Sequence, residues 1–199
     1  MDRPNTKERL LRTALDLIWA ESYGFVSVGD ICKKAGLHKG SFYHFFKSKS
    51  ELAASALSIF WKALEPKLDY IIYSHEPLKK KISQLCDTIY TLHKKKSEQF
   101  GFVCGCPYII VGSERAHIDK ELGAVVKPIF DQRAKYFFQL ARDAAHEKYI
   151  KPGEVESKAT LLFASYLGLL IQARINNDLT ILKNMKNFYY GALNIKNKK

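Results

Sequence analysis

Proline and glycine are scarce in this sequence, and long apolar runs are missing. The 199 residues include 11 glycines and 6 prolines, while hydrophobic residues make up 47%. This composition is typical of a well-packed helical protein and argues against disorder. The longest apolar stretch, residues 159–173, is too short to cross a bilayer. No alternation of period two persists along the chain, which disfavours β-strands.

Signals for export and for disulfide bonding are also missing. The first residues carry charge where a signal peptide needs an apolar core. The four cysteines, at positions 32, 86, 104 and 106, do not form a disulfide framework. We therefore expect a cytoplasmic protein with free thiols and no membrane partner.

Enzyme motifs do not stand out. There is no Ser/His/Asp order, no glycine loop that would cradle a phosphate and no HExxH sequence. We therefore expect no catalytic residues and no cofactor. Positive charge, in contrast, is abundant: the formal net charge is +12, which attracts polyanions such as nucleic acid. Because lysine runs occur at 79–81 and 94–96 as well, charge alone does not locate a binding face.

Apolar residues recur at helical spacing throughout the chain. This pattern predicts an all-α fold of nine to ten helices, with three short helices in a domain over 1–48 and a larger helical bundle over 49–199. Two of the expected long helices contain prolines, which should kink the first and interrupt the second. The expected helices cover 6–22, 28–35, 40–46, 49–73 with Pro66, 77–96, from 107, 122–148 with Pro128, 155–176 and 179–192.

Residues 26–52 have the spacing of a helix-turn-helix motif. Ile31 and Ala35 lie on one face of the first helix, and Phe42 and Phe45 on one face of the second. Gly36 falls at the bend, where a positive φ would call for glycine. Packing of these inner faces would leave the outer face of the second helix exposed.

That outer face carries hydrogen-bonding side chains of the kind that read base edges and phosphates in a major groove. In addition, "AGLHKGSFYHFFKSKSEL" (35–52) resembles the DNA-binding signature of the TetR family of bacterial repressors. The resemblance implies that Tyr43 and Lys49 contact phosphate and that Lys39, Ser41 and His44 lie where family members often touch bases. For His44, packing on the short helix stays an alternative. The residues assigned to DNA are Ser27, Lys39, Gly40, Ser41, Tyr43, His44 and Lys49.

The resemblance also implies a homodimer that binds a pseudo-palindromic operator in double-stranded DNA. Its last two helices would pair with their symmetry mates in a four-helix bundle. Residues 155–176 are apolar all round, which suits burial on both sides; burial wholly inside one monomer stays an alternative. The residues expected at the dimer interface are Leu162, Tyr166, Leu169, Leu170, Ala173, Leu182, Met185, Phe188 and Tyr189.

A ligand-responsive regulator, most often a repressor, needs a pocket for its inducer. The resemblance implies that this pocket lies among the later helices, and the aromatic side chains there favour an apolar or aromatic small molecule. The candidate pocket residues are Trp61, Tyr90, Phe102, Cys106, Tyr108, Phe137 and Tyr166.

The stretch "FVCGCPYIIVG" (102–112) places two cysteines one residue apart. Gly105–Pro107 resembles a G-C-P element that begins helix six in one group of TetR-like proteins, and Pro107 suits a first helical turn. Since a helix N-terminus favours a thiolate, a redox or electrophile sensor built on Cys104 and Cys106 is an alternative. One C-x-C pair is a poor zinc signature, so we predict no metal site. A regulator that acts by protein contact without DNA is a third possibility.

Overall fold

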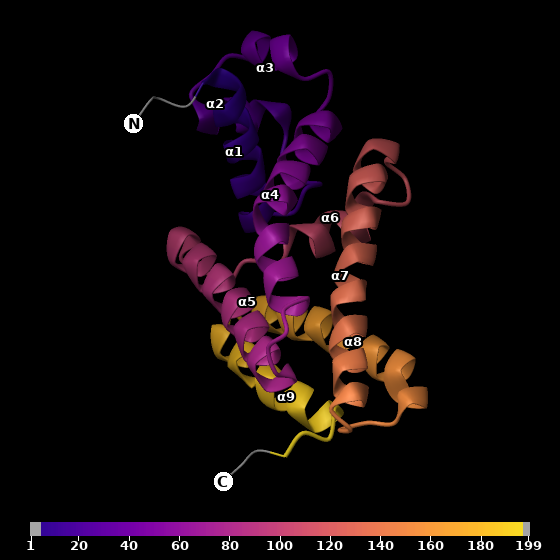
Figure 1. Cartoon of the computed structure of the whole chain (residues 1–199). Coiled ribbons are helices and arrows are strands. Elements are labelled where there is room, and N and C mark those ends of the chain that lie inside the picture. Colours follow the sequence, from indigo (N-terminus) through magenta and orange to yellow (C-terminus); the bar gives the residue numbers. More distant parts are fainter. Residues whose placement is uncertain (1–4, 197–199) are drawn as a thin grey trace. The chain divides into compact units, whose positions relative to one another are not determined.

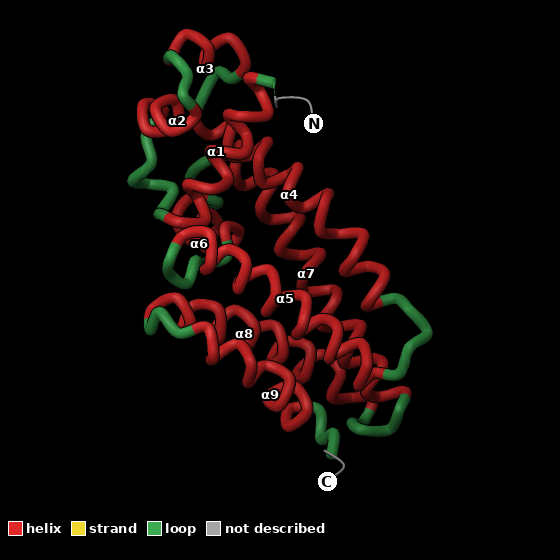
Figure 2. Tube along the Cα trace, turned by 90° about the vertical axis from the view of Figure 1, so that its left-hand side faces the viewer, coloured by secondary structure: helices red, strands yellow, loops and turns green. Residues whose placement is uncertain are grey.

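The structure is a computed structural model, and it describes residues 5–196 (Figures 1 and 2). Over that range it has nine α-helices, two short 3-10 helices and no strand, which confirms the predicted all-α fold. Among the same residues, no helix combines the length and apolar character that crossing a bilayer requires. The elements are α1 (Thr6–Ala20), α2 (Val28–Ala35), α3 (Lys39–Phe45), α4 (Lys49–Ile72), α5 (Leu78–Phe100), α6 (Pro107–Arg115), α7 (Lys120–His146), η1 (Pro152–Glu154), α8 (Val155–Ile175), η2 (Leu179–Asn184) and α9 (Met185–Ala192).

The chain forms two compact units. The first contains the described residues up to Ala63 together with Gly105–Phe130, and the second contains Leu64–Cys104 together with the described residues from Asp131 onward. Packing therefore divides the chain differently from the predicted ranges 1–48 and 49–199, whose outer ends lie outside the described residues. The predicted division into a DNA-binding domain and a ligand-binding and dimerisation domain stays a prediction.

The first unit is built on the packing of α2 and α3 against α1. Its core consists of aliphatic and aromatic side chains from these helices and from the start of α4: Leu10, Ala14, Leu17, Val26, Ile31, Cys32, Ala35, Phe42, Phe46 and Leu52. Helix α6 belongs here because Tyr108 packs on α4. The Tyr108 ring stacks on Phe60, 6.0 Å between ring centroids, and its hydroxyl donates to the carbonyl oxygen of Leu57 at 3.0 Å.

The second unit brings α5, α8, η2 and α9 together. Large apolar side chains from all four elements are fully or almost fully buried, among them Leu85, Leu162, Leu182 and Tyr189. Lys81 is buried in this unit as well, and its ammonium pairs with the Asp143 carboxylate at 2.7 Å. The unit is therefore a closed helical core with one buried ion pair.

Two expectations about helix continuity were wrong. Helix α7 runs through Pro128 without interruption, because a proline removes one backbone hydrogen bond while the neighbouring side chains Val126 and Ile129 stay buried. The last expected helix is divided into η2 and α9. Asp178 caps the start of η2, where its side chain accepts a hydrogen bond from the Thr180 N–H at 2.8 Å. The tighter 3-10 turns of η2 follow this cap.

Candidate nucleic-acid interface and internal cavity

The turn between α2 and α3 has the geometry expected for the helix-turn-helix. Gly36 has φ 63° and ψ 43°, the left-handed conformation that glycine adopts at a helix end. The Leu37 N–H then donates to the Cys32 carbonyl at 2.9 Å. Arg9 of α1 donates to the carbonyl oxygens of Ala35 and Gly36. This arginine closes the end of α2, a role that the local sequence pattern did not reveal.

Ser27 begins α2 through a reciprocal capping box. The Asp30 N–H donates to the Ser27 hydroxyl oxygen at 3.1 Å, and the Ser27 N–H donates to the Asp30 carboxylate at 2.9 Å. These hydrogen bonds lower the pKa of Asp30. The carboxylate therefore stays charged beside Ser27, where it opposes the approach of a phosphate. Ser27 is a helix cap in this structure, and its contact with DNA stays a prediction.

Helix α3 lies at one end of the first unit (Figure 1). Phe42 is completely buried, whereas Tyr43 is 60% exposed. Lys39, Gly40 and His44 are exposed too, and Ser41 is half-buried. The expected inner pair was wrong in one member: Phe45 is exposed, and Phe46, just after the helix, fills the core instead.

Lys49 lies at the start of α4, but its ammonium group is engaged inside the first unit. It donates to the carbonyl oxygens of Tyr23 at 3.0 Å and Val26 at 2.7 Å, and it lies 4.1 Å from the centroid of the Tyr23 ring. Burial, with the nearby Arg115, lowers its pKa. Lys49 thus anchors the loop before α2, and its contact with phosphate stays a prediction.

Acidic residues tie the same loop to α6 and α7. The Ser22 hydroxyl donates to Glu114 at 2.6 Å, and the Gly24 N–H donates to the same carboxylate at 3.3 Å. Ser50 donates to Asp119 and lies 3.1 Å from the Tyr23 hydroxyl. These contacts join positions 27 to 92 residues apart in the chain, so no local sequence signal could have found them.

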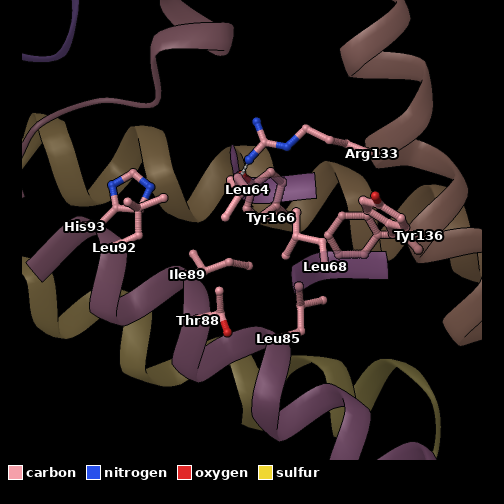
Figure 3. A pocket seen from close by; sticks show the side chains of 11 residues that line it. Leu64, Leu68, Leu85, Thr88, Ile89, Leu92, His93, Arg133, Tyr136 and Tyr166 are labelled. Atoms are coloured by element: carbon pink, nitrogen blue, oxygen red, sulfur yellow. Dashed lines mark hydrogen bonds between the residues drawn. The ribbon is translucent and has the colours of Figure 1, made fainter. Parts of the chain in front are cut away.

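The second unit encloses a cavity of about 30 Å³ (Figure 3). Phe137 and Tyr166, two of the predicted pocket residues, line it together with side chains from α4, α5 and α7. Arg133 is 8% exposed; it donates to the Tyr166 hydroxyl, and its guanidinium carbon lies 5.2 Å from the centroid of that ring. His93 lies on the wall formed by α5.

The other predicted pocket residues lie elsewhere. Trp61, Tyr108 and Cys106 are buried in the first unit, Tyr90 is half-buried on α5, and Phe102 is exposed. Aromatic composition pointed to them, but aromatic side chains fill cores as readily as they line cavities. The polar wall residues, Arg133 and His93, were missed because an isolated arginine or histidine has no sequence signature.

Most of the predicted dimer residues point into their own unit. Leu169 is half-buried, Phe188 is exposed, and the other seven are buried in the core of the second unit. Their apolar character predicted burial correctly, and their place at a dimer interface stays a prediction. A different stripe of α8, with spacings of three and four, contains the exposed Leu161, Ala164, Ile171 and Ile175 and the half-buried Gly168.

The two cysteines of residues 102–112 are both buried. Cys104 belongs to the second unit, and its sulfur lies 3.7 Å from the Phe102 carbonyl oxygen. Cys106 is the residue before α6, and Pro107 begins that helix as expected. Within residues 5–196, no three His, Cys, Asp or Glu side chains converge as a metal-binding group.

Comparison with known proteins agrees with this site. Residues 10–56 match the family model described as "Bacterial regulatory proteins, tetR family". The Escherichia coli HTH-type transcriptional repressor NemR is 25% identical over 188 residues, covering 90% of this chain and 89% of NemR. By the family-model match, the helix-turn-helix segment of the chain belongs to the TetR family of bacterial regulatory proteins.

Solved structures show the same fold. A TetR transcriptional regulator from Legionella pneumophila has a TM-score of 0.79 and 24% identity, covering 96% of this chain and 98% of that one. The reduced form of E. coli NemR has a TM-score of 0.73 and 22% identity, covering 94% and 95%. A regulator from Saccharomonospora viridis in complex with choline has a TM-score of 0.75 and 17% identity, covering 93% and 95%.

Proposed function

We propose that this protein is a ligand-responsive transcriptional repressor that binds a pseudo-palindromic operator as a homodimer and is released by a small-molecule inducer. The observation that carries the proposal is the outward face of α3, where Lys39, Tyr43 and His44 are exposed over a helix anchored by the buried Phe42. Such a face offers cationic and hydroxyl donors to phosphates and base edges. The NemR repressor is similar over most of both chains.

The dimer would form through the exposed stripe of α8. Leu161, Ile171 and Ile175 are apolar and solvent-exposed in the single chain, and a stripe with spacings of three and four is the pattern that pairs helices side by side. Two α3 helices would then lie about one turn of DNA apart, roughly 34 Å. An inducer that prefers another conformation of the second unit shifts the population away from that spacing.

The inducer would occupy the cavity of the second unit. Its walls are largely leucine, isoleucine and aromatic side chains, which suits an apolar or aromatic molecule. The Saccharomonospora viridis regulator, described in complex with choline, shows that a protein of this fold accepts a small organic molecule.

Operator binding tests the role of α3. We expect the protein to shift a DNA fragment from its own upstream region, and we expect Tyr43→Phe and Lys39→Gln each to weaken binding roughly tenfold. Lys39→Gln should also flatten the dependence on salt, because a lysine ammonium displaces counterions whereas a tyrosine hydroxyl does not. Fluorescence anisotropy at several salt concentrations measures both effects. Lys95→Gln, an exposed lysine of α5, serves as the control. Normal binding by both α3 variants contradicts the proposed face.

Thiol sensing is a second candidate function, favoured by the position of Cys106 at the start of α6 and by a relative whose structure is described as a reduced form. With a quinone, the Cys106 sulfur would add to a ring carbon. The thiol proton would pass to one quinone oxygen and the hydrogen of the attacked carbon to the other, which leaves a hydroquinone thioether. The new bulk at a 3% exposed position would distort the first unit.

For this second candidate, we expect 1,4-benzoquinone to release operator DNA from the wild type and from Cys104→Ser, but not from Cys106→Ser. A filter-binding assay with increasing quinone measures the release. If Cys106→Ser protein releases DNA at the same quinone concentration as the wild type, Cys106 has only a structural role.

A further inference from the structure

The cavity of the second unit has a mostly apolar wall that also contains basic side chains. Most of its wall is aliphatic, from Leu64 and Leu68 of α4 and Leu85 and Ile89 of α5. The polar side chains on the wall are a threonine, two tyrosines, His93 and Arg133, and no carboxylate belongs to the lining. Only the last two of these side chains ordinarily carry positive charge.

Arg133 supplies a fixed positive charge. A guanidinium group stays protonated at every pH that a folded protein meets, and it carries five N–H donors in a planar fork. One of these donors points to the Tyr166 hydroxyl, and the group lies over the Tyr166 ring. In Figure 3 the guanidinium extends from α7 across the top of the cavity, above the leucine side chains.

His93 adds no charge at neutral pH. Burial, together with the nearby Arg133, lowers its pKa from 6.5 to about 4. Tyr136 keeps its proton too: burial raises its pKa, and its hydroxyl donates to the Asp69 carboxylate at 2.6 Å. Asp69 is outside the lining. The wall residues therefore present a single positive charge, at Arg133, over an otherwise apolar surface.

We infer that the inducer of this protein is an apolar monocarboxylate, bound with its carboxylate at Arg133 and Tyr166 and its apolar body along the leucines of α4 and α5. This inference rests on the proposed function, whose ligand class it defines. The planar fork of arginine matches the two oxygens of a carboxylate. An apolar wall rejects a second unpaired charge, which favours a monoanion.

The cavity is too small for such a ligand unless the surrounding side chains move. About 30 Å³ is far below the roughly 300–1,000 Å³ of pockets that hold drug-sized ligands. An apolar carboxylate therefore enters only when the leucine side chains of α4 and α5 move apart. The ligand thus binds a widened second unit better than the one described here, which is the condition for a ligand to shift the population of conformations.

Matched pairs of ligands test the inference by isothermal titration calorimetry. The probes are decanoate with decanamide and 4-phenylbutanoate with 4-phenylbutanamide, because each amide keeps the shape of its acid and lacks the charge. We expect at least one carboxylate to bind the wild type tenfold or more tightly than its amide. Amides that bind as tightly as the acids, or a panel in which no acid binds at millimolar concentration, overturn the inference.

Variants at position 133 assign the preference to one side chain. Arg133→Gln should abolish the preference for the acid, Arg133→Lys should retain most of it, and the exposed Arg142→Gln on the same helix should leave it unchanged. An undiminished preference in Arg133→Gln overturns the assignment. If circular dichroism shows that this variant does not fold, the comparison of acid and amide binding to the wild type still tests the ligand class.

Operator retention without ligand is measured separately on the wild type. A protein that prefers carboxylates but does not retain DNA would refute the proposed repressor and leave the ligand class intact. A repressor that retains DNA but does not discriminate between acid and amide would refute the ligand class alone.

Discussion

Ile171→Glu is expected to elute as a monomer in size-exclusion chromatography and to lose roughly 100-fold or more in operator affinity. The affinity falls because, in a dimer, binding of one α3 helix to its half-site holds the second α3 helix at a high effective concentration near the other half-site. A monomer does not have this advantage. The substitution leaves α3 untouched. The affinity measured by anisotropy therefore reports on the assembly, and the elution volume reports on it directly.

The position of Ile171 makes this variant a clean one. Its side chain is 44% exposed in the single chain, so a glutamate there stays solvated in the monomer and does not disturb the core. In a dimer that buries the α8 stripe, two glutamates would meet near the symmetry axis without cationic partners. The expected damage is therefore confined to association.

Thr91→Glu is the matched control, since it adds the same charge at an exposed position of α5 in the same unit. It should remain dimeric and bind the operator normally. A dimeric Ile171→Glu protein would show that the exposed stripe of α8 is not the interface.

Acidification from pH 7 to pH 4 is expected to cost about 3 kcal/mol of unfolding free energy through His93 alone. Burial first, and Arg133 second, lower the pKa of this residue from 6.5 to about 4 in the folded protein. Between those two values the unfolded chain binds a proton that the folded protein refuses. The contribution is thus complete above pH 6.5 and is lost as the pH falls toward 4.

Urea unfolding of wild type and His93→Gln at half-unit pH steps measures this contribution. The comparison uses the slope of unfolding free energy against pH between pH 6.5 and 4, which does not depend on the overall stability of each protein, and the variant curve should be flatter there. His75→Gln, at an exposed position, should keep the wild-type slope. Equal slopes in wild type and His93→Gln would contradict the assignment of the titration to His93.

The helix-turn-helix was predictable from the sequence because its signals are local. Gly36 at the bend and Phe42 on the inner face lie close together in the sequence, and the structure contains both features in the expected form. The all-α fold was predictable for the same reason, since apolar spacing along one helix needs no information from distant residues.

The sequence was less informative about which face of a helix is buried and which groups a side chain contacts. Residues 155–176 are apolar on every side, so their spacing could not distinguish the face that packs inside the second unit from the one that stays exposed. Lys49 matched a family position, yet its contacts depend on where the loop at Tyr23 and Val26 ends in space. Phe45 and Phe46 differ by one position, and the end of α3 decided between them.

By itself, the sequence determined the helices, the turn that joins α2 to α3 and the polar residues that α3 presents, because hydrogen bonds and apolar periodicity within short segments specify them. Tertiary structure alone decided three things: the cavity that joins Arg133 to Tyr166, the burial that keeps His93 neutral, and the exposure of Ile171 on α8. Each depends on distances between residues far apart in the chain, and such distances exist only after the helices have packed.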